Sequence, residues 1–163
     1  YVADSLREQV QRIRQLDADI KAIEVRLAAV RRSNEDMKRI AAIPGVGLLT
    51  ATAAIATMGQ AKAFKTAREF CAWLGLVPRQ RSTGGKTKLG SVSKMGQTDI
   101  RRLLIVGAMS VIRWVVRKGG SSNRWLAALV ARKPRMVAAV ALANKMARMI
   151  WAMTTKQENY RMA

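Results

Sequence analysis

Hydrophobic residues recur every seven positions near the start of the chain, in two series offset by three residues. The first series is Leu6, Ile13, Ile20 and Leu27, and the second is Leu16, Ile23 and Val30, with the polar Gln9 at one further position of the second series. A repeat of about 3.5 residues is typical of the a and d positions of a coiled coil. It predicts one long helix over 2–32 that pairs within the chain or with a second chain. A single amphipathic helix lying on the rest of the molecule is the alternative.

Shorter helical segments follow, separated by glycine and proline. Apolar residues on both sides of "IPGVG" predict a helix that begins near Glu35, a tight turn and a second helix. The segment "TAREFCAWLG" predicts a short helix with a capping box, formed by Thr66 and Glu69, and an end at Gly75. From 76 to 96 no helical period is present, and the residues around "TGG" allow a small β-hairpin.

The rest of the chain predicts three further helices. Thr98 can cap a helix to about Lys118, Ser121 and Ser122 can begin another to about Arg132, and Pro134 can open a last helix to about Met153. We therefore expect an all-α fold in three parts. These are a coiled-coil helix at 1–36, a compact basic helical domain at 37–155 and a polar tail at 156–163. The basic domain would contain a helix-hairpin-helix turn and a basic loop or small β-hairpin.

Charge is distributed unevenly between these parts. The chain has 30 Lys and Arg against 10 Asp and Glu, a net charge of +20. Residues 1–36 carry seven basic and seven acidic side chains, so the excess lies in 37–163, where 23 cations face Glu69, Asp99 and Glu158. This predicts a polyanion partner, nucleic acid as the first interpretation and an anionic membrane surface as the second. Lys and Arg interrupt the apolar stretches, so we expect no membrane-spanning segment.

Several classes of chemistry are excluded within this chain. Histidine is absent and Cys71 is the single cysteine, which excludes zinc-finger ligation and Ser-His-Asp catalysis and fits a reducing compartment. Two-metal cleavage of a phosphodiester needs several carboxylates that converge on Mg²⁺, and those of the basic region are few and scattered. We expect no metal site and no cofactor bound by this chain.

The turn "PGVG" is the first candidate contact with nucleic acid. Its residues are Pro44, Gly45, Val46 and Gly47. A glycine-rich turn before a helix can expose backbone N–H groups, and the positive end of the helix dipole favours a phosphate there. Such contacts position DNA without reading its sequence. The alternative is a turn that contains Pro and Gly for steric reasons alone.

The basic segment "RQRSTGGKTKLGS", residues 79–91, is the second candidate. Gly84 and Gly85 let the backbone approach a ligand, and cations surround them, with two more in the next helix: Arg79, Arg81, Lys86, Lys88, Lys94, Arg101 and Arg102. A serine among cations has its alkoxide favoured, and the same cations would stabilise a pentavalent phosphorus transition state, so Ser82 is the candidate nucleophile. The alternative is that Ser82 and Thr83 bond phosphates or cap the turn.

Other residues have structural interpretations. The four tryptophans lie at helical spacings among aliphatic residues, and we expect them in the core rather than as platforms for base stacking; they are Trp73, Trp114, Trp125 and Trp151. Cys71 is expected to be a small buried residue, and the methionines to fill gaps in the core.

Residues 43–108 resemble the C-terminal transposase domain of the insertion-sequence family called IS one-ten, which includes the pilin-gene-inverting recombinases. The resemblance rests on "PGVG", "AWLGLVPRQ", "STGGK" and "SKMGQTDIRRLL" in this order, and extends more loosely to about Met153. It implies that Ser82 is the nucleophile, with Ser91 and Ser93 as fallback candidates. It also implies a preceding coiled coil, and an N-terminal RuvC-like domain whose acidic residues bind Mg²⁺. That domain is not in this sequence, and Tyr1 rather than Met suggests a piece of a longer protein.

The resemblance further implies DNA and a structured guide RNA as partners, homo-oligomers, and a cytoplasmic location on prokaryotic DNA. We expect a domain for transposition or site-specific recombination in which Ser82 attacks the scissile phosphate and nearby cations hold it; these are Arg79, Arg81, Lys86 and Lys94. The isolated chain would be inactive. The rival interpretation is a non-catalytic module for nucleic-acid binding and oligomerisation, and a third is a basic protein of membrane surfaces.

Overall fold

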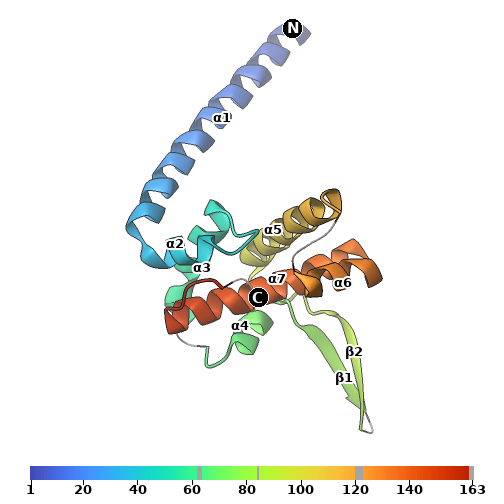
Figure 1. Ribbon diagram of the computed structural model, residues 1–163. Coiled ribbons are helices and arrows are strands. Elements are labelled where there is room, and N and C mark those ends of the chain that lie inside the picture. The colour runs from blue at the N-terminus through green and yellow to red at the C-terminus, as the bar shows by residue number, and fades with distance from the viewer. Residues whose placement is uncertain (62–63, 84, 120–122, 162–163) are drawn as a thin grey trace.

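A long helix leads into a helical body from which a two-stranded ribbon projects (Figure 1). The computed structural model describes residues 1–61, 64–83, 85–119 and 123–161, with the backbone alone at 58–61, 82, 83 and 87. The elements are α1 (Val2–Ser33), α2 (Glu35–Ala41), α3 (Leu48–Ala61), α4 (Ala67–Trp73), β1 (Pro78–Thr83), β2 (Lys86–Val92), α5 (Thr98–Arg117), α6 (Arg124–Arg132) and α7 (Arg135–Lys156). The mostly helical fold and the small hairpin are confirmed.

Helix α1 stands away from the body along most of its length (Figure 1). It contains no buried residue, and side chains of its apolar seam are open, with Leu6 62% and Ile13 59% exposed. Its C-terminal end meets α2 and α3. Asn34 ends it in an extended conformation, and the Asn34 Oδ1 accepts from the N–H of Met37 at 2.9 Å, which starts α2. The alternative of a helix lying on the body is therefore wrong.

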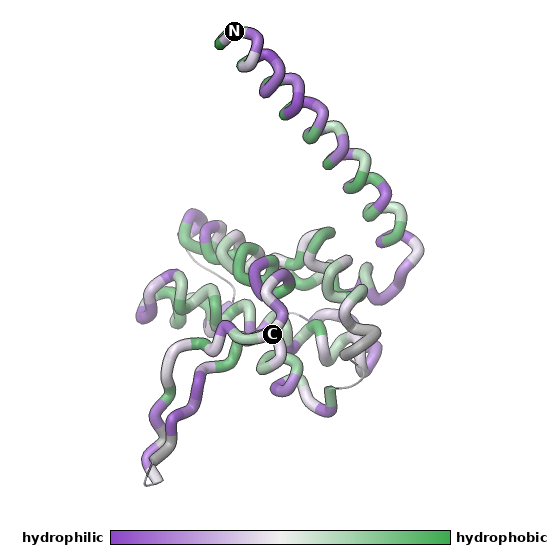
Figure 2. The backbone as a smooth tube through the Cα atoms, turned by 180° about the vertical axis from the view of Figure 1, so that it is seen from behind, coloured by the Kyte–Doolittle hydropathy of each residue, from purple (hydrophilic) through white to green (hydrophobic). Residues whose placement is uncertain are grey.

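The core of the body forms where α7 packs against α4 and α5. One face of α5 is buried at intervals of three or four residues, namely at Ile100, Leu104, Ala108, Ile112 and Val115. Opposite it, α7 buries small residues such as Ala139 and Ala143, which let the helices approach closely. Each fully buried Ile or Leu contributes about 1.5–3 kcal/mol of transfer free energy. Figure 2 shows these helices as largely hydrophobic and the ribbon as more hydrophilic.

Helix α7 is long and apolar enough to cross a bilayer by length and composition alone. Eight of its residues are nevertheless buried inside the body, against α4 and α5. The core helix of a globular domain passes the same test, and packing accounts for the composition of α7.

Thr66 caps α4 as predicted, because its Oγ1 accepts from the N–H of Glu69 at 3.2 Å. The Glu69 carboxylate accepts from the N–H of Lys65, the residue before the cap, at 2.9 Å, and not from that of Thr66 as in the predicted capping box. Thr98, the expected cap of α5, is instead its first residue, since Gln97 holds the cap position. Asn123 caps α6 through the N–H of Leu126 at 3.1 Å, while Ser121 and Ser122 lie outside the described residues.

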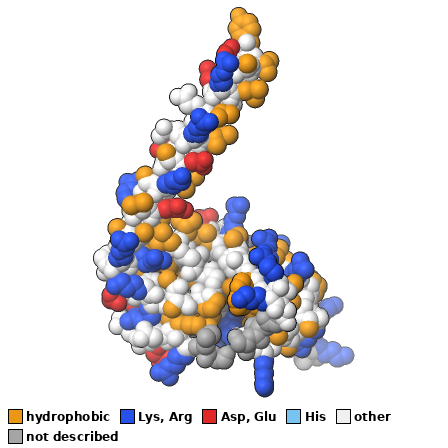
Figure 3. Space-filling model, turned by 45° about the horizontal axis from the view of Figure 1, so that its top comes forward, with side chains coloured by type: hydrophobic (Ala, Val, Ile, Leu, Met, Phe, Trp, Pro, Cys, Tyr) orange, Lys and Arg blue, Asp and Glu red, His pale blue; other side chains and the backbone are white. Residues whose placement is uncertain are grey.

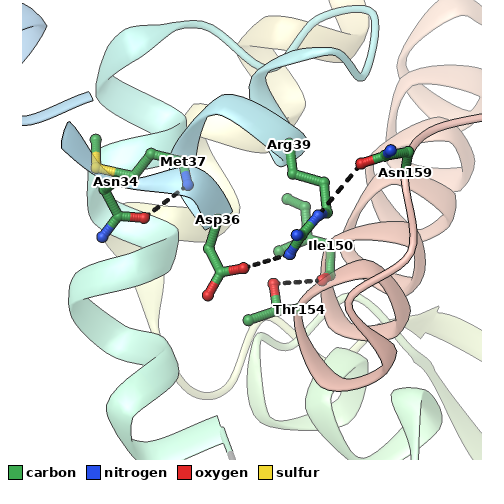
Figure 4. Close-up of polar contacts among 7 residues, drawn as sticks. All are labelled: Asn34, Asp36, Met37, Arg39, Ile150, Thr154 and Asn159. Carbon is green, nitrogen blue, oxygen red and sulfur yellow. Dashed lines mark hydrogen bonds and ion pairs between the residues drawn. The ribbon is translucent and has the colours of Figure 1, made fainter. Parts of the chain in front are cut away.

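The segment after α7 returns to α2 (Figure 4). The Arg39 guanidinium contacts the Asp36 carboxylate at 2.5 Å and donates through Nε to the Asn159 Oδ1 at 3.3 Å. Tyr160 packs against the core. Thr154, in the last turn of α7, donates to the carbonyl of Ile150 at 2.8 Å. The described part of the predicted polar tail is thus attached to the body.

Two of the four tryptophans pack in or against the core, and the other two are exposed. Trp73 packs with Phe64 and Phe70 in an aromatic cluster, with ring centroids 5.4 and 6.1 Å away, and Trp151 is half-buried against the core. Trp114 and Trp125 are 54% and 39% exposed. The prediction that all four lie in the core is therefore wrong for Trp114 and Trp125.

Candidate nucleic-acid interface

Cations gather on one face of the ribbon formed by β1 and β2. The strands are antiparallel, with Arg81 opposite Lys88 and Thr83 opposite Lys86. Residues two apart in a strand share a face, so Arg81, Lys88 and Lys86 belong to one face, which we call the basic face. All three side chains are exposed. Gly85, with φ +76°, lies in the turn at the tip of the ribbon, and Gly84 lies outside the described residues.

The Ser82 position belongs to the other face of the ribbon. Its register partner is Thr87, and this pair lies between the Arg81–Lys88 and Thr83–Lys86 pairs. Adjacent positions of a strand alternate between faces, so the register places Ser82 with Gln80 and Leu89. The sequence puts Ser82 beside the cations, whereas the pleat separates the Ser82 position from the basic face. The fallback residues lie nearer the body: Ser91 is exposed on β2, and Ser93 follows the strand.

The ribbon is attached to the body through close backbone packing at its root. The N–H groups of Ser93, Lys94 and Gln97 donate to the carbonyls of Val77, Gly75 and Trp73. A Cβ on Gly75 would lie 2.1 Å from the Met95 oxygen, and one on Gly96 would lie 1.9 Å from the Trp73 oxygen. Both glycines also have positive φ, of 71° and 105°. This packing therefore explains the glycines of the motifs "AWLGL" and "SKMGQ".

Two of the predicted contact arginines hold the root in place. Arg79, at the irregular start of β1, donates to the Ser93 carbonyl at 3.2 Å. Arg101 donates through Nη1 to the Leu74 carbonyl at 3.0 Å and through Nη2 to the Thr98 Oγ1 at 3.1 Å. Lys94 is exposed, with φ +54°, and Arg102 is exposed on α5. Arg101 is thus first a structural residue, and Lys94 and Arg102 remain open to a ligand.

The "PGVG" turn packs against α5. A Cβ on Gly45 would lie 2.8 Å from the Gly107 oxygen, and a Cβ on Gly107 would lie 2.0 Å from the Gly45 oxygen. Val46 is 5% exposed, and its N–H donates to the Ile43 carbonyl at 2.9 Å. Val46 therefore offers neither its side chain nor its N–H to a phosphate, contrary to its place in the predicted contact set. Pro44 and Gly47 are exposed beside the start of α3.

Within the described part of the chain, carboxylates pair with cations on α1 and α2 and not elsewhere on the body. Among the described residues, the ion pairs between side chains are Arg7–Asp4, Lys38–Glu35 and Arg39–Asp36. A hydrogen bond from Lys38 lowers the pKa of Glu35. Figure 3 shows blue side chains spread over the body and few red ones. In the same described part, no group of three His, Cys, Asp or Glu side chains could hold a metal ion. The basic surface of the body is therefore open to an external anion.

Sequence reasoning missed Trp114 as a surface residue. The buried positions of α5 run from Ile100 through Leu104, Ala108 and Ile112 to Val115, and Trp114 lies one residue before the last of them. At about 100° of rotation per residue, Trp114 lies beside the buried face of the helix and not within it. The helical period contained this signal, and the general preference of tryptophan for cores outweighed it.

Comparison with known proteins identifies the family. The model of the Transposase IS116/IS110/IS902 family matches residues 37–130. A Pseudomonas aeruginosa protein named "Probable family 20 transposase" is 44% identical over 98% of this chain and 47% of its own length.

Two further relatives are named as transposases. The transposase for insertion sequence element IS1111A of Coxiella burnetii is 46% identical over 89% of this chain and 40% of its own length. The transposase for insertion sequence element IS1328 of Yersinia enterocolitica is 36% identical over 96% of this chain and 47% of its own length. The chain thus spans about half the length, or less, of the relatives that it matches. It belongs to the Transposase IS116/IS110/IS902 family.

Proposed function

We propose that this chain contacts DNA during transposition and that the basic face of the ribbon grips the phosphate backbone. The Arg81–Lys88 pair carries the proposal. Like charges directly opposite each other in a sheet destabilise it by roughly 0.2–1 kcal/mol. A phosphate between them removes this repulsion and gains two charge-assisted contacts. A fold that keeps such a pair exposed and unneutralised is suited to an anion that arrives from outside.

The shape of the ribbon supports the same role. A two-stranded antiparallel ribbon fits the major groove of B-DNA, where phosphates flank it on both sides. The ribbon projects from the body (Figure 1), so a duplex can reach the basic face without contacting α7. Phosphates held in this way position the DNA and do not read its sequence.

The test is duplex binding by Arg81→Ala and Lys88→Ala over a range of salt concentrations. Each phosphate contact contributes about 0.9 to the slope of log K against log salt, so each variant should lower that slope by about one. Lys21→Ala is the matched control, because Lys21 is exposed on the charge-balanced α1. Equal slopes for the three variants and the parent chain would remove the basic face from the proposal.

The catalytic part of the proposal assigns the nucleophile to Ser82. The Ser82 Oγ attacks the scissile phosphorus and an Oγ–P bond forms. The bond from phosphorus to one deoxyribose oxygen breaks, and that oxygen leaves with the proton from Ser82. Arg81, which precedes Ser82 in sequence, and Lys86, which belongs to the next register pair, neutralise the phosphate, with Arg79 and Lys94 toward the root. Carboxylates and Mg²⁺ come from a RuvC-like domain outside this chain, so the chain alone is inactive.

A covalent protein–DNA adduct distinguishes this mechanism from the rival module that only binds. The full-length transposase, incubated with labelled donor DNA and Mg²⁺, should yield an adduct on a denaturing gel that Ser82→Ala abolishes. Ser91→Ala and Ser93→Ala serve as controls, and loss of the adduct in one of them would move the nucleophile there. Adduct formation by Ser82→Ala would contradict the Ser82 assignment. The separation of Ser82 from the basic face in the register favours the rival module.

The second proposed partner is another copy of this chain, bound through α1. We propose that the open seam of α1 pairs with α1 of a second copy, because no other described element covers it and its flanks are charge-balanced. Ile13→Glu with Ile20→Glu should convert a dimer to a monomer in sedimentation equilibrium, whereas the exposed Lys21→Glu should leave the dimer intact.

A structured RNA is a second ligand for the cations of the basic face. Binding to anionic vesicles equal to DNA binding at the same salt would favour a membrane-surface protein instead.

A further inference from the structure

A cavity of about 460 Å³ lies between α5, α6, α7 and the turn at Pro44 and Gly45, on the body rather than on the ribbon. Its floor is apolar and includes Leu126, Leu142 and Met146, which are 3%, 8% and 0% exposed. Trp114 lines it as well and is 54% exposed. Ligand cavities in proteins commonly measure about 300–1,000 Å³ and combine an apolar lining with a few polar groups.

Cations lie at the edge of this cavity. Lys145 and Arg161 line it, and the Lys118 ammonium lies 4.8 Å from the centroid of the Trp114 ring. Lys145 lies 4.5 Å from the ring of the neighbouring Trp125. Among the described lining residues there is no Asp or Glu. The cavity therefore presents an aromatic ring, an apolar floor and a positive rim, which complements a flat apolar group that carries a negative charge.

We infer that this cavity takes one unpaired nucleobase of a single-stranded nucleic acid, with the adjoining phosphates on Lys118, Lys145 and Arg161. The inference rests on the proposed function that the chain binds nucleic acid. Base stacking on an exposed tryptophan is stronger than an exposed cation–π contact, so a base can displace the Lys118 ammonium from the Trp114 ring. The displaced ammonium then becomes available to a phosphate. Stacking of this kind tolerates any base, and it adds to the duplex contacts proposed for the ribbon.

The experiment measures binding of oligothymidylate to the chain by quenching of tryptophan fluorescence and by competition. Trp114→Ala should weaken this binding about 5- to 100-fold and remove most of the quenching, whereas Trp114→Phe should restore most of the affinity. Trp125→Ala is the matched control, since Trp125 is also half-exposed but does not line the cavity. An oligonucleotide of the same length with abasic sites should bind the parent chain as weakly as oligothymidylate binds Trp114→Ala. Oligouridylate, run in parallel, distinguishes RNA from DNA as the source of the base.

Equal binding of oligothymidylate and the abasic oligonucleotide, or of the parent and Trp114→Ala, would overturn the inference. So would a Trp114 signal that changes with protein concentration and not with oligonucleotide, because the cavity would then hold protein. Duplex binding separates the two proposals: Trp114→Ala should leave duplex affinity within twofold of the parent, and Arg81→Ala should lower it. Duplex binding that persists while Trp114→Ala has no effect refutes the base site alone. Absence of duplex binding by the parent chain refutes the proposed function.

Discussion

Gly75, Gly85 and Gly96 share a positive φ but differ in what surrounds them. A Cβ on Gly75 or Gly96 would overlap a backbone carbonyl oxygen, whereas a Cβ on Gly85, at the tip of the ribbon, would have nothing within 4 Å. The sequence indicated that glycines matter in this region, and it assigned the importance to Gly84 and Gly85. It could not reveal that Gly75 meets Met95, because that contact joins segments that only the folded chain brings together.

Alanine substitutions at these glycines should therefore differ in cost. Gly75→Ala should lower the free energy of unfolding by more than about 2 kcal/mol, because it combines an unfavourable φ with a backbone clash. Gly85→Ala should cost only about 1 kcal/mol, from the φ alone. Urea denaturation followed by circular dichroism measures both. Similar losses for the two variants would contradict the account of the root.

Burial alters the chemistry of the Cys71 thiol. Burial raises the pKa of its thiol from 9.0 to about 11, against a smaller lowering by Arg148. The thiolate is the reactive form, so a thiol reagent at pH 8 should label the folded protein far more slowly than the urea-unfolded protein. The raised pKa also means that Cys71 contributes stability fully below about pH 9, and that this contribution is lost as the pH rises through about 11. Equal labelling rates in the two states would contradict its burial.

Among the elements, the ribbon and α1 show what periodicity can predict. The heptads gave the extent of α1 closely, because every apolar position reported on the same seam. The turn residues predicted the hairpin but not its register, and the register pairs Arg81 with Lys88 and the Ser82 position with the Thr87 position. A shift by one residue would exchange the two faces, and nothing in the local sequence fixes that choice. The sequence thus named the cations of the candidate site but could not say which of them share a face of the ribbon.

The register leads to a variant that should gain stability and lose binding. Lys88→Glu places a carboxylate opposite Arg81, which should stabilise the fold by about 0.2–1 kcal/mol and weaken duplex binding more than Lys88→Gln does. Thermal denaturation and filter binding on the same samples measure the two effects. A stabilised variant with undiminished duplex affinity would show that the basic face does not contact DNA.

At the scale of the whole molecule, the body and α1 are nearly independent. The core lies entirely within 37–153, and α1 contributes no buried residue to it. The boundary near residue 36 was predicted from charge balance and periodicity, two properties that reflect different environments for the two parts. What the sequence did not decide is that α1 leaves the body along most of its length, since its seam could equally have packed on apolar surface of the same chain.

A chain that begins at Asn34 should therefore keep the stability of the body. It retains the Asn34 cap of α2 and loses no buried residue, so its melting temperature should stay within about 3 °C of the parent. Differential scanning calorimetry at low protein concentration tests this. A drop of ten degrees or more would mean that the base of α1 supports the core.

The length of α1 would set the distance between the two bodies of the proposed dimer. Its 32 residues, at a rise of about 1.5 Å each, measure about 48 Å, which is the length of about 14 base pairs of B-DNA. Two copies joined through antiparallel α1 helices would hold their bodies at opposite ends of the paired helices, whereas parallel helices would hold the bodies side by side. If the chain binds DNA as the proposed dimer, the spacing between the two protected DNA segments would therefore report whether the α1 helices are parallel or antiparallel.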